Sequence, residues 1–287
     1  MKIAVIGGGA SGMVTAYQLD KQGHQVTVFE RQPILGGHIR TLNKNVKPNQ
    51  SDCSEILESG VLEFPTAFKD FIALMQELGM ELEPVKVGSS MFFNNGSRCL
   101  SGVMIDRNFT GPRKLVEHLR LDTMYARSAR LWLRTQFSNL KDFSDQPLSQ
   151  YLGRPCDRNT WLKLLIMYSY SIPFELIDDF PAELAIPTLR DYIAAHWVRV
   201  KGGVYSYIEK ILTRFEGEIV LDVEISRIFR GPDVVKVVRS TGEVQTFDKV
   251  VFATPPDQVM ALLADPSDAE TKRFSAWKAS YATSLVH

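Results

Sequence analysis

The sequence predicts an α/β fold built on a parallel sheet, and three features support this prediction. Residues 2–6 form an apolar run without alternation, as in a strand buried on both faces of a parallel sheet. A glycine-rich turn at residues 7–12 follows at once and leads into a helical pattern. A second apolar run, residues 26–29, ends at the acidic Glu30. Together these features predict a Rossmann-like β-α-β unit at the start of the chain.

Composition and charge exclude several classes of protein. Apolar residues make up 45% of the 287 residues and charged residues 23%, as in a globular chain of one large domain or two interleaved ones. The 33 Lys and Arg balance the 33 Asp and Glu, whereas a nucleic-acid-binding protein would need a basic surplus. Three cysteines without a C-x-x-C pair favour a reducing compartment and predict no metal site.

No apolar run reaches the roughly 18 residues that span a bilayer. We therefore expect a cytoplasmic protein without a cleaved leader.

The glycine turn predicts a dinucleotide site. Gly7, Gly9 and Gly12 have the spacing G-x-G-x-x-G. In such a turn the first glycine permits the tight bend, the second lets a pyrophosphate approach the backbone, and the third lets the helix pack on the strand. Ala10 and Ser11 open the helix, whose first N–H groups suit phosphate oxygens.

The helix after this turn should end at Gly23. We expect its sheet-facing residues to be Met13, Ala16, Tyr17 and Leu19. Glu30 follows Gly12 by 18 residues, where a carboxylate can accept hydrogen bonds from ribose hydroxyls, and Arg31 comes next. A glycine turn without a ligand, with Glu30 as a surface acid, is the alternative.

The segment after Glu30 resembles the second glycine signature of the family that contains the flavin amine oxidases, protoporphyrinogen oxidase and phytoene desaturase. Gly36 and Gly37 occupy the paired-glycine positions. In that family the pair brings the backbone against the cofactor, so the resemblance implies FAD rather than NAD. The family form has Arg where this chain has His38, and Arg40 is the nearest basic substitute. An ordinary loop with two turn glycines is the alternative.

Further segments continue the resemblance. Glu58, Ser59 and Gly60 resemble the family segment that leaves the flavin edge and enters a helix, with Pro65 in the first helical turn. Apolar residues at helical spacing then predict core positions, namely Phe68, Phe71, Ile72, Met75 and Leu78.

The later part of the chain predicts the rest of the nucleotide-binding fold. A strand at 219–221 leads to Val223, where the family's valine lends its backbone N–H and C=O to the adenine. Runs at 234–239 and 244–247 flank a hairpin turn and predict a three-stranded antiparallel meander. The strand at 249–252 ends at the return-strand residues Ala253, Thr254 and Pro255.

The resemblance implies an FAD-binding domain at 1–80 and 200–264, with an inserted, mainly helical substrate domain at 81–199 and 265–287, present only in part. Arg127, Arg130 and Arg134 recur at helical spacing, either as a solvated face or as a peripheral membrane contact. His196 and Trp197 form either a packed pair or an approach to the flavin ring.

The family's closing flavin segment is not found after Pro256, so we expect a shortened or atypical chain. Its cofactor groove should be open beside Gly36-Gly37 and Glu58-Ser59-Gly60, with apolar side chains facing it.

The resemblance implies an FAD-dependent oxidoreductase that moves hydride to flavin N5 from a small-molecule substrate, either an amine or an apolar, activated hydrocarbon. The electron acceptor is unknown, and no side chain has a spacing that assigns it a catalytic role. One alternative is an isomerase of a polyunsaturated lipid. Another is a flavin-free binding protein similar to the Rab GDP-dissociation inhibitors. Those proteins lose the third glycine of the turn, which this chain keeps as Gly12.

Overall fold

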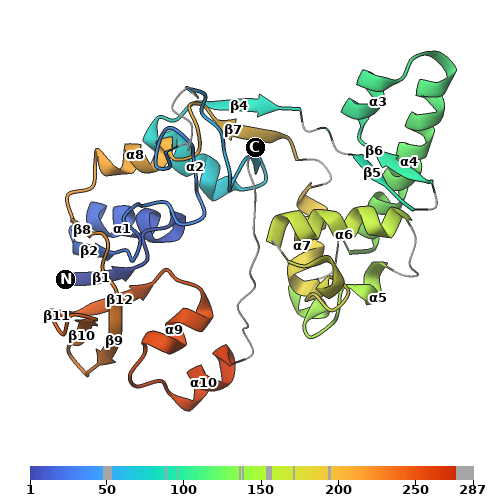
Figure 1. Ribbon diagram of the computed structural model, residues 1–287. Helices are drawn as coiled ribbons and strands as arrows, with labels where there is room; N and C mark the ends of the chain where they lie inside the picture. Colours follow the sequence, from blue (N-terminus) through green and yellow to red (C-terminus); the bar gives the residue numbers. More distant parts are fainter. Residues whose placement is uncertain are drawn as a thin grey trace. The chain divides into compact units, whose positions relative to one another are not determined.

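The computed structural model describes residues 1–47, 54–86, 88, 90–94, 96–135, 137, 139–152, 157–170, 172–192 and 195–275. The chain divides into two compact units (Figure 1). Unit 1 comprises Met1–Glu63, Asp70–Glu83 and the chain from Arg199 onward, and unit 2 comprises Phe64–Lys69 and Pro84–Val198. The assignment of a cofactor domain and a substrate domain to particular ranges stays a prediction.

A four-stranded parallel sheet forms the centre of unit 1. Its order is β12-β1-β2-β8, and every pair in it is parallel. The carboxyl ends of these strands therefore meet at one edge, where open α/β sheets bind their ligands. The strands are β1 (Lys2–Ile6), β2 (Gln25–Phe29), β8 (Glu218–Val220) and β12 (Lys249–Phe252).

Two layers cover the faces of this sheet. Helix α1 (Ala10–Lys21) packs on one face through Met13, Ala16 and Tyr17, three of the four residues expected there, while Leu19 is half-buried. The antiparallel meander β11-β10-β9 packs on the other face, where the Phe29 and Phe247 rings meet edge to face at 5.8 Å. The meander consists of β9 (Ile225–Arg230), β10 (Val235–Arg239) and β11 (Val244–Phe247). The predicted parallel sheet and meander are thus confirmed.

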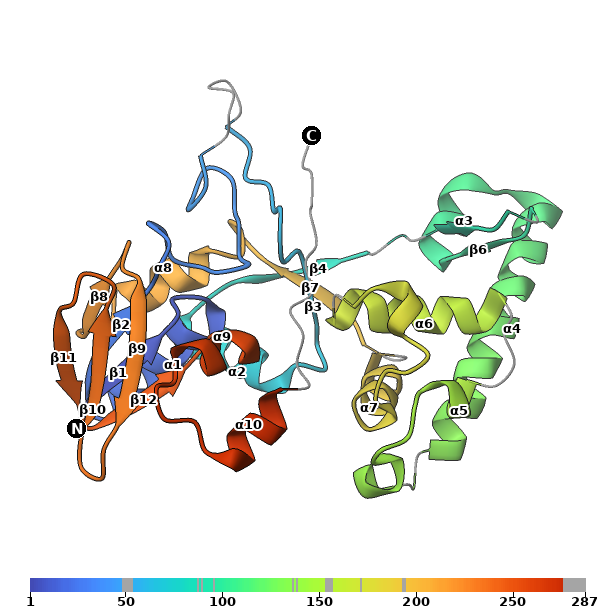
Figure 2. The ribbon, with the colours of Figure 1, turned by 60° about the horizontal axis from the view of Figure 1, so that its bottom comes forward.

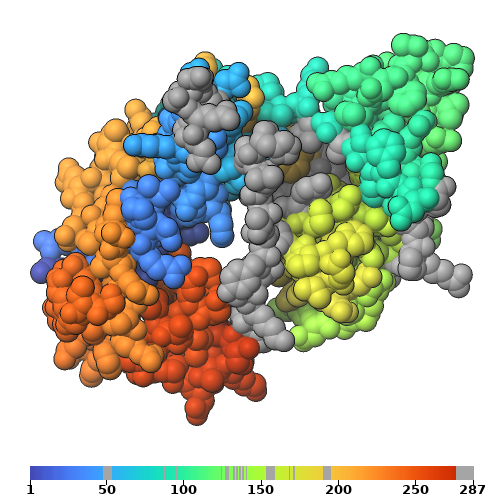
Figure 3. Space-filling view, viewed as in Figure 1, coloured from blue at the N-terminus to red at the C-terminus, as the bar shows by residue number. Residues whose placement is uncertain are grey.

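The described part of unit 1 contains four further helices: α2 (Lys69–Leu78), α8 (Ser206–Leu212), α9 (Pro256–Leu262) and α10 (Asp268–Phe274). Helix α9 contacts β9, and the red surface of α9 and α10 adjoins the orange surface of the meander in Figure 3.

Unit 2 is mainly helical, as predicted. A hydrophobic cluster joins α4, η1, α5, α6 and α7, and a smaller one lies around β6, α3 and α4. The elements are β5 (Ser90–Phe92), β6 (Arg98–Leu100), α3 (Gly102–Asn108), α4 (Gly111–Thr135), η1 (Leu140–Phe143), α5 (Ser149–Leu152), α6 (Asp157–Tyr170), η2 (Phe174–Leu176) and α7 (Ala182–Tyr192). Among the helices described here, none has the length and hydropathy needed to cross a bilayer.

Three short strands lie where the chain passes between the units, and they correct one prediction. They are β3 (Phe64–Pro65), β4 (Leu82–Val85) and β7 (Trp197–Val200), in the order β3-β7-β4. Pro65 therefore lies in a strand and not in the first turn of a helix, which begins at Lys69. Because Phe68 precedes that helix, it is 45% exposed and not a core residue, whereas Met75 and Leu78 are fully buried. Phe71 and Ile72 are half-buried.

Candidate dinucleotide site

The glycine turn lies at the carboxyl edge of the parallel sheet, between β1 and α1. The Gly7 N–H donates to the Phe29 carbonyl at 2.8 Å, and Gly7 has a φ of +108°, which disfavours any other residue. A Cβ added to Gly12 would lie 1.8 Å from the Gly7 carbonyl oxygen. Gly7 and Gly12 are therefore required by the turn and by helix packing, as predicted from their spacing.

Gly9 differs from these two glycines. Its φ of −76° suits any residue, and a Cβ there would come no closer than 3.6 Å to the Gly37 Cα, an ordinary contact. Gly9 is also the N-cap of α1, with no side chain to accept hydrogen bonds from the first helical turn. The internal packing of the described residues thus leaves this position open, and a ligand that approaches the backbone closely would explain the glycine.

The second glycine segment lies directly against the first. The Gly36 N–H donates to the Gly8 carbonyl at 2.9 Å, and Gly9 and Gly36 form an isolated parallel bridge. A Cβ at Gly37, whose φ is +58°, would lie 2.9 Å from the Gly9 Cα. Two segments predicted separately therefore combine into one backbone-lined cradle.

The Glu30 carboxylate organises the edge of this cradle. It accepts the Gly8 N–H at 2.7 Å through Oε2 and the Gln32 N–H at 2.8 Å through Oε1. The Val223 N–H donates to the Glu30 carbonyl at 3.1 Å, so Val223 lies beside the acid. The N–H that we expected to bind the adenine is thus already hydrogen-bonded within the protein. Arg31 is exposed at the same strand end. The ligand roles of these residues stay predictions.

A polar network around the buried Thr41, which the sequence did not reveal, holds the second glycine segment in place. Thr41 is fully buried, and its hydroxyl donates to Glu58 Oε2 at 2.8 Å while accepting the Tyr205 N–H at 3.2 Å. Glu58 Oε1 accepts the Val204 N–H at 2.6 Å. The Glu58 carboxylate therefore supports the loop, and its expected place beside the flavin stays a prediction. The glycine pair Gly202-Gly203, which leads the chain to Val204 and Tyr205, is a sequence feature that could have pointed to this contact.

Asn45 and Tyr205 complete this support. The Asn45 amide donates to the Leu35 and Ile39 carbonyls at 3.0 and 2.7 Å, closing the loop on itself. The Tyr205 ring would meet a Cβ on Gly36 at 3.4 Å. Burial, and then the nearby Glu209 carboxylate, raise the pKa of Tyr205, which keeps the phenol neutral.

The segment at 58–60 runs against the same loop. The Ser59 N–H donates to the Arg40 carbonyl at 2.9 Å, and a Cβ on Gly60 would lie 1.9 Å from the His38 carbonyl oxygen. The His38 side chain is exposed. The apolar residues flanking the segment are exposed as well, namely Ile56 at 44%, Leu57 at 39% and Leu62 at 57%. The expected groove itself stays a prediction.

Two polar atoms beside the cradle are buried without a hydrogen-bond partner among the described residues. They are the Arg40 Nη1 and the Thr254 hydroxyl. A guanidinium is always charged, and leaving such a group unpaired is costly. Thr254 lies at the glycine turn, since its Cγ2 would be 3.3 Å from a Cβ on Gly7, and the Ala253 N–H donates to the Ile6 carbonyl. A guanidinium with one buried nitrogen that lacks an acceptor, a hydroxyl without a partner among the described residues and an open backbone cradle fit a dinucleotide with its pyrophosphate.

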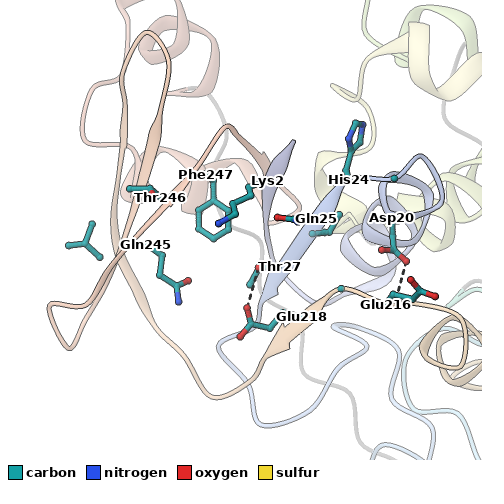
Figure 4. A pocket seen from close by; sticks show the side chains of 14 residues that line it. Lys2, Asp20, His24, Gln25, Thr27, Glu216, Glu218, Gln245, Thr246 and Phe247 are labelled. Carbon is teal, nitrogen blue, oxygen red and sulfur yellow. Dashed lines mark hydrogen bonds between the residues drawn. The ribbon is translucent and has the colours of Figure 1, made fainter.

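A separate cleft of about 760 Å³ lies at the opposite edge of the sheet (Figure 4). Lys2, Gln25, Thr27 and Glu218 line it from the strands, and Asp20 and His24 line it from helix α1 and the turn after it. Because it adjoins the amino ends of β1 and β2, it is not part of the cradle.

The fold and the cradle define a dinucleotide-binding α/β protein, and comparison with known sequences gives its family. The family model for flavin containing amine oxidoreductase matches residues 10–286. The chain belongs to this family, and its cofactor is FAD.

The individual proteins that resemble this chain have low sequence identity to it. A 4,4'-diapophytoene desaturase (4,4'-diaponeurosporene-forming) of Staphylococcus aureus strain bovine RF122 / ET3-1 is 23% identical over 307 positions, covering 92% of this chain and 57% of that protein. Putrescine oxidase with bound putrescine superimposes with a TM-score of 0.66 at 19% identity, covering 96% of this chain and 63% of the other. A CLA-producing fatty acid isomerase from P. acnes gives 0.66 at 18% identity, covering 95% and 63%. These structural likenesses show the fold, and the chain spans little more than half the length of its curated relatives.

Proposed function

We propose that this chain provides the FAD-binding part of an oxidoreductase that removes hydride from an amine or from an activated, unsaturated hydrocarbon. The observation that carries the proposal is the meeting of two glycine segments at the carboxyl edge of the sheet, where internal packing does not require Gly9 to be glycine. The family match to flavin containing amine oxidoreductases supports the reaction class.

The residues of the cradle have distinct roles in this proposal. The first turn of α1 and the backbone of Gly9 and Gly37 would receive the pyrophosphate, with Arg40 as the nearby cation. Glu30 would accept hydrogen bonds from the ribose while it holds the Gly8 N–H. The bound flavin would supply the hydride acceptor at N5, and the protein would position the substrate and exclude water.

The cofactor and the reaction are tested in sequence. The protein is first denatured and the released nucleotide is identified by chromatography, and we expect FAD. Release of NAD, or no FAD uptake on reconstitution, contradicts the proposal and favours a flavin-free binding protein. The flavin-loaded protein is then mixed without oxygen with amines, and separately with unsaturated hydrocarbons. Bleaching of the flavin absorbance by one class identifies the substrate.

An isomerase of a polyunsaturated lipid is the second candidate, and the structural likeness to the fatty acid isomerase favours it. It would use the same cofactor site without net oxidation. Product analysis separates the two candidates, because an isomerase returns a product of unchanged mass and leaves the flavin oxidised at the end of turnover.

A further inference from the structure

The Gly36-Gly37 turn of the cradle combines two glycines with positive φ angles, +114° and +58°, and in this conformation it lies against Gly9. Glycine loses more conformational freedom on folding than any other residue, so a glycine pair does not keep such a conformation by itself. Backbone hydrogen bonds hold the turn at Gly36, whose N–H donates to the Gly8 carbonyl and whose carbonyl accepts the Ile39 N–H, both at 2.9 Å. A side chain that fixes both ends of the turn would therefore matter for the whole cradle.

The Asn45 side chain makes these contacts. Its amide nitrogen donates to the Leu35 carbonyl, which precedes the glycine pair, at 3.0 Å and to the Ile39 carbonyl, which follows it, at 2.7 Å. Its oxygen accepts the Thr41 N–H at 2.9 Å. A Cβ on Gly36 would lie 2.7 Å from the amide nitrogen, so the amide packs directly against this glycine. Among side chains of this length, only asparagine offers two donors and an acceptor on one planar group.

Other contacts attach the same loop to distant parts of unit 1. Thr41 accepts the Tyr205 N–H, and Lys44 forms an ion pair with Glu209 of α8. Figure 2 shows the blue loop that follows β2 running beside α8. The three hydrogen bonds of Asn45, in contrast, reach no further than ten residues along the chain. Loss of the Asn45 amide should therefore loosen the turn without unfolding unit 1.

We propose that Asn45 is a positioning residue of the cofactor site, which holds the Gly36-Gly37 turn against Gly9 so that the cradle is formed before the dinucleotide binds. A protein that is only partly in its binding-competent conformation binds its ligand more weakly by that fraction. The inference rests on the proposed function for the identity of the ligand, FAD, but the effect of Asn45 on the turn can be measured without a ligand.

The first measurement is hydrogen exchange in the cofactor-free protein. In Asn45→Ala the N–H groups of Gly36, Ile39 and Thr41 should exchange roughly tenfold faster or more than in the wild type, because the turn opens more often. The melting temperature should stay near that of the wild type, because the lost contacts are local. Unchanged exchange overturns the proposal. So does a large fall in melting temperature, which would make Asn45 a structural residue of the whole unit.

The second measurement is FAD titration of the full chain. At about pH 8, Asn45→Ala and Asn45→Asp should both weaken FAD binding by roughly tenfold or more, because each loses the two donated hydrogen bonds. Asn43→Asp is the matched control in the same loop. The Asn43 amide donates to the Glu55 carbonyl at 2.7 Å, an acceptor outside the glycine turn, so this change should leave FAD affinity unchanged. An equal loss in Asn43→Asp overturns the proposal.

The Asn45→Asp variant adds a pH dependence that a general loss of stability would not reproduce. Its carboxylate cannot donate hydrogen bonds and would face two carbonyl oxygens, so the pKa of the introduced carboxyl should lie above its ordinary value. The neutral carboxyl regains one donor. FAD affinity relative to the wild type should therefore recover in Asn45→Asp as the pH falls from about 8 to about 5, but not in Asn45→Ala.

The other titratable groups around this loop are the same in all of these proteins, namely His38, Lys44, Glu58, Tyr205 and Glu209. A recovery seen only in Asn45→Asp therefore belongs to the introduced carboxyl. No recovery, or the same recovery in Asn45→Ala, overturns the proposal.

This proposal and the proposed function can fail separately. If the wild type takes up no FAD, the proposed function is contradicted, and hydrogen exchange alone then supports or overturns the role of Asn45 in the turn. If the wild type binds FAD and Asn45→Ala binds it equally well, the proposed function stands and the role of Asn45 is refuted.

Discussion

Gly9 and Gly12 belong to the same turn, but different constraints explain why each position holds a glycine. At Gly12 an added Cβ would overlap the Gly7 carbonyl, so folding alone excludes alanine. At Gly9 the backbone conformation and the surrounding space both accept a Cβ. Nothing among the described residues distinguishes glycine from alanine there, whereas a ligand close to the backbone would, and this difference provides a direct test of the cradle.

Gly9→Ala should leave the melting temperature of the cofactor-free protein unchanged and weaken FAD binding at least tenfold, because the methyl group would occupy the space of the pyrophosphate. Gly12→Ala should lower the unfolding free energy itself by about 1–3 kcal/mol or more, as overpacking does. Thermal melts with and without FAD, together with flavin titration, measure both effects. Normal FAD affinity in Gly9→Ala would place the pyrophosphate elsewhere.

Glu30→Ala should weaken FAD binding by roughly 10- to 100-fold, because a hydrogen bond to a charged group contributes about 1.5–3 kcal/mol. It should also lower stability modestly, because the Gly8 and Gln32 N–H groups lose their acceptor. Flavin titration and urea unfolding separate the two effects. Glu224→Ala, at an exposed acid of the same unit, is the control. Unchanged affinity in Glu30→Ala would make Glu30 a purely structural acid.

At the scale of elements, Arg230 connects the meander to the last described helix. Its guanidinium bonds Asp265 at 3.0 Å and Glu270 at 2.6 Å, and Glu270 also accepts the Ser267 N–H at the start of α10. These contacts, the Arg230 hydrogen bond first among them, lower the pKa of Glu270 to about 2. The end of β9 and the N-terminus of α10 are thereby joined through one carboxylate.

The pKa of Glu270 predicts a pH dependence. An acid whose pKa falls on folding stabilises the fold fully above its unfolded pKa, near 4.3, and loses this contribution as the pH falls toward about 2. In Glu270→Gln the free energy of unfolding should therefore decrease less than in the wild type as the pH falls from near 4.3 to about 2. Urea denaturation at several pH values in this range measures the difference. Asp268→Asn, in the same helical turn, is the matched control. Parallel curves for wild type and Glu270→Gln would refute the assignment.

For the whole molecule, FAD should protect unit 1 selectively. A ligand that binds only the folded state stabilises the segments that form its site. Hydrogen exchange with and without FAD should show slowing in residues 7–13, 36–42 and 252–255, with no change in α6 and α7 of unit 2. Slowing confined to unit 2, or none anywhere despite FAD binding, would contradict the location of the cradle.

The sequence by itself determined the parts of this protein that depend on local pattern. Unbroken apolar runs predict the strands at residues 2–6 and 26–29. The glycine spacing predicts the turn at Gly7, Gly9 and Gly12. The hairpin and the return strand follow from the same logic, since strand, turn and helix preferences act over a few neighbouring residues. Such patterns have limits, as Pro65 and Phe68 show. The apolar spacing predicts a helix that includes both residues, but Phe64 and Pro65 pair with β7 as a strand, so the helix begins only at Lys69.

Only the tertiary structure decided which groups meet across long separations. Glu58 binds the Val204 N–H across 146 residues, and the two glycine segments touch through Gly8 and Gly36. It also revealed the buried Arg40 Nη1, which has no hydrogen-bond partner among the described residues, and the exposed leucines of α4, because burial depends on everything that packs around a residue. A sequence period shows that two faces of a helix are apolar, but it cannot tell which of them the rest of the fold covers.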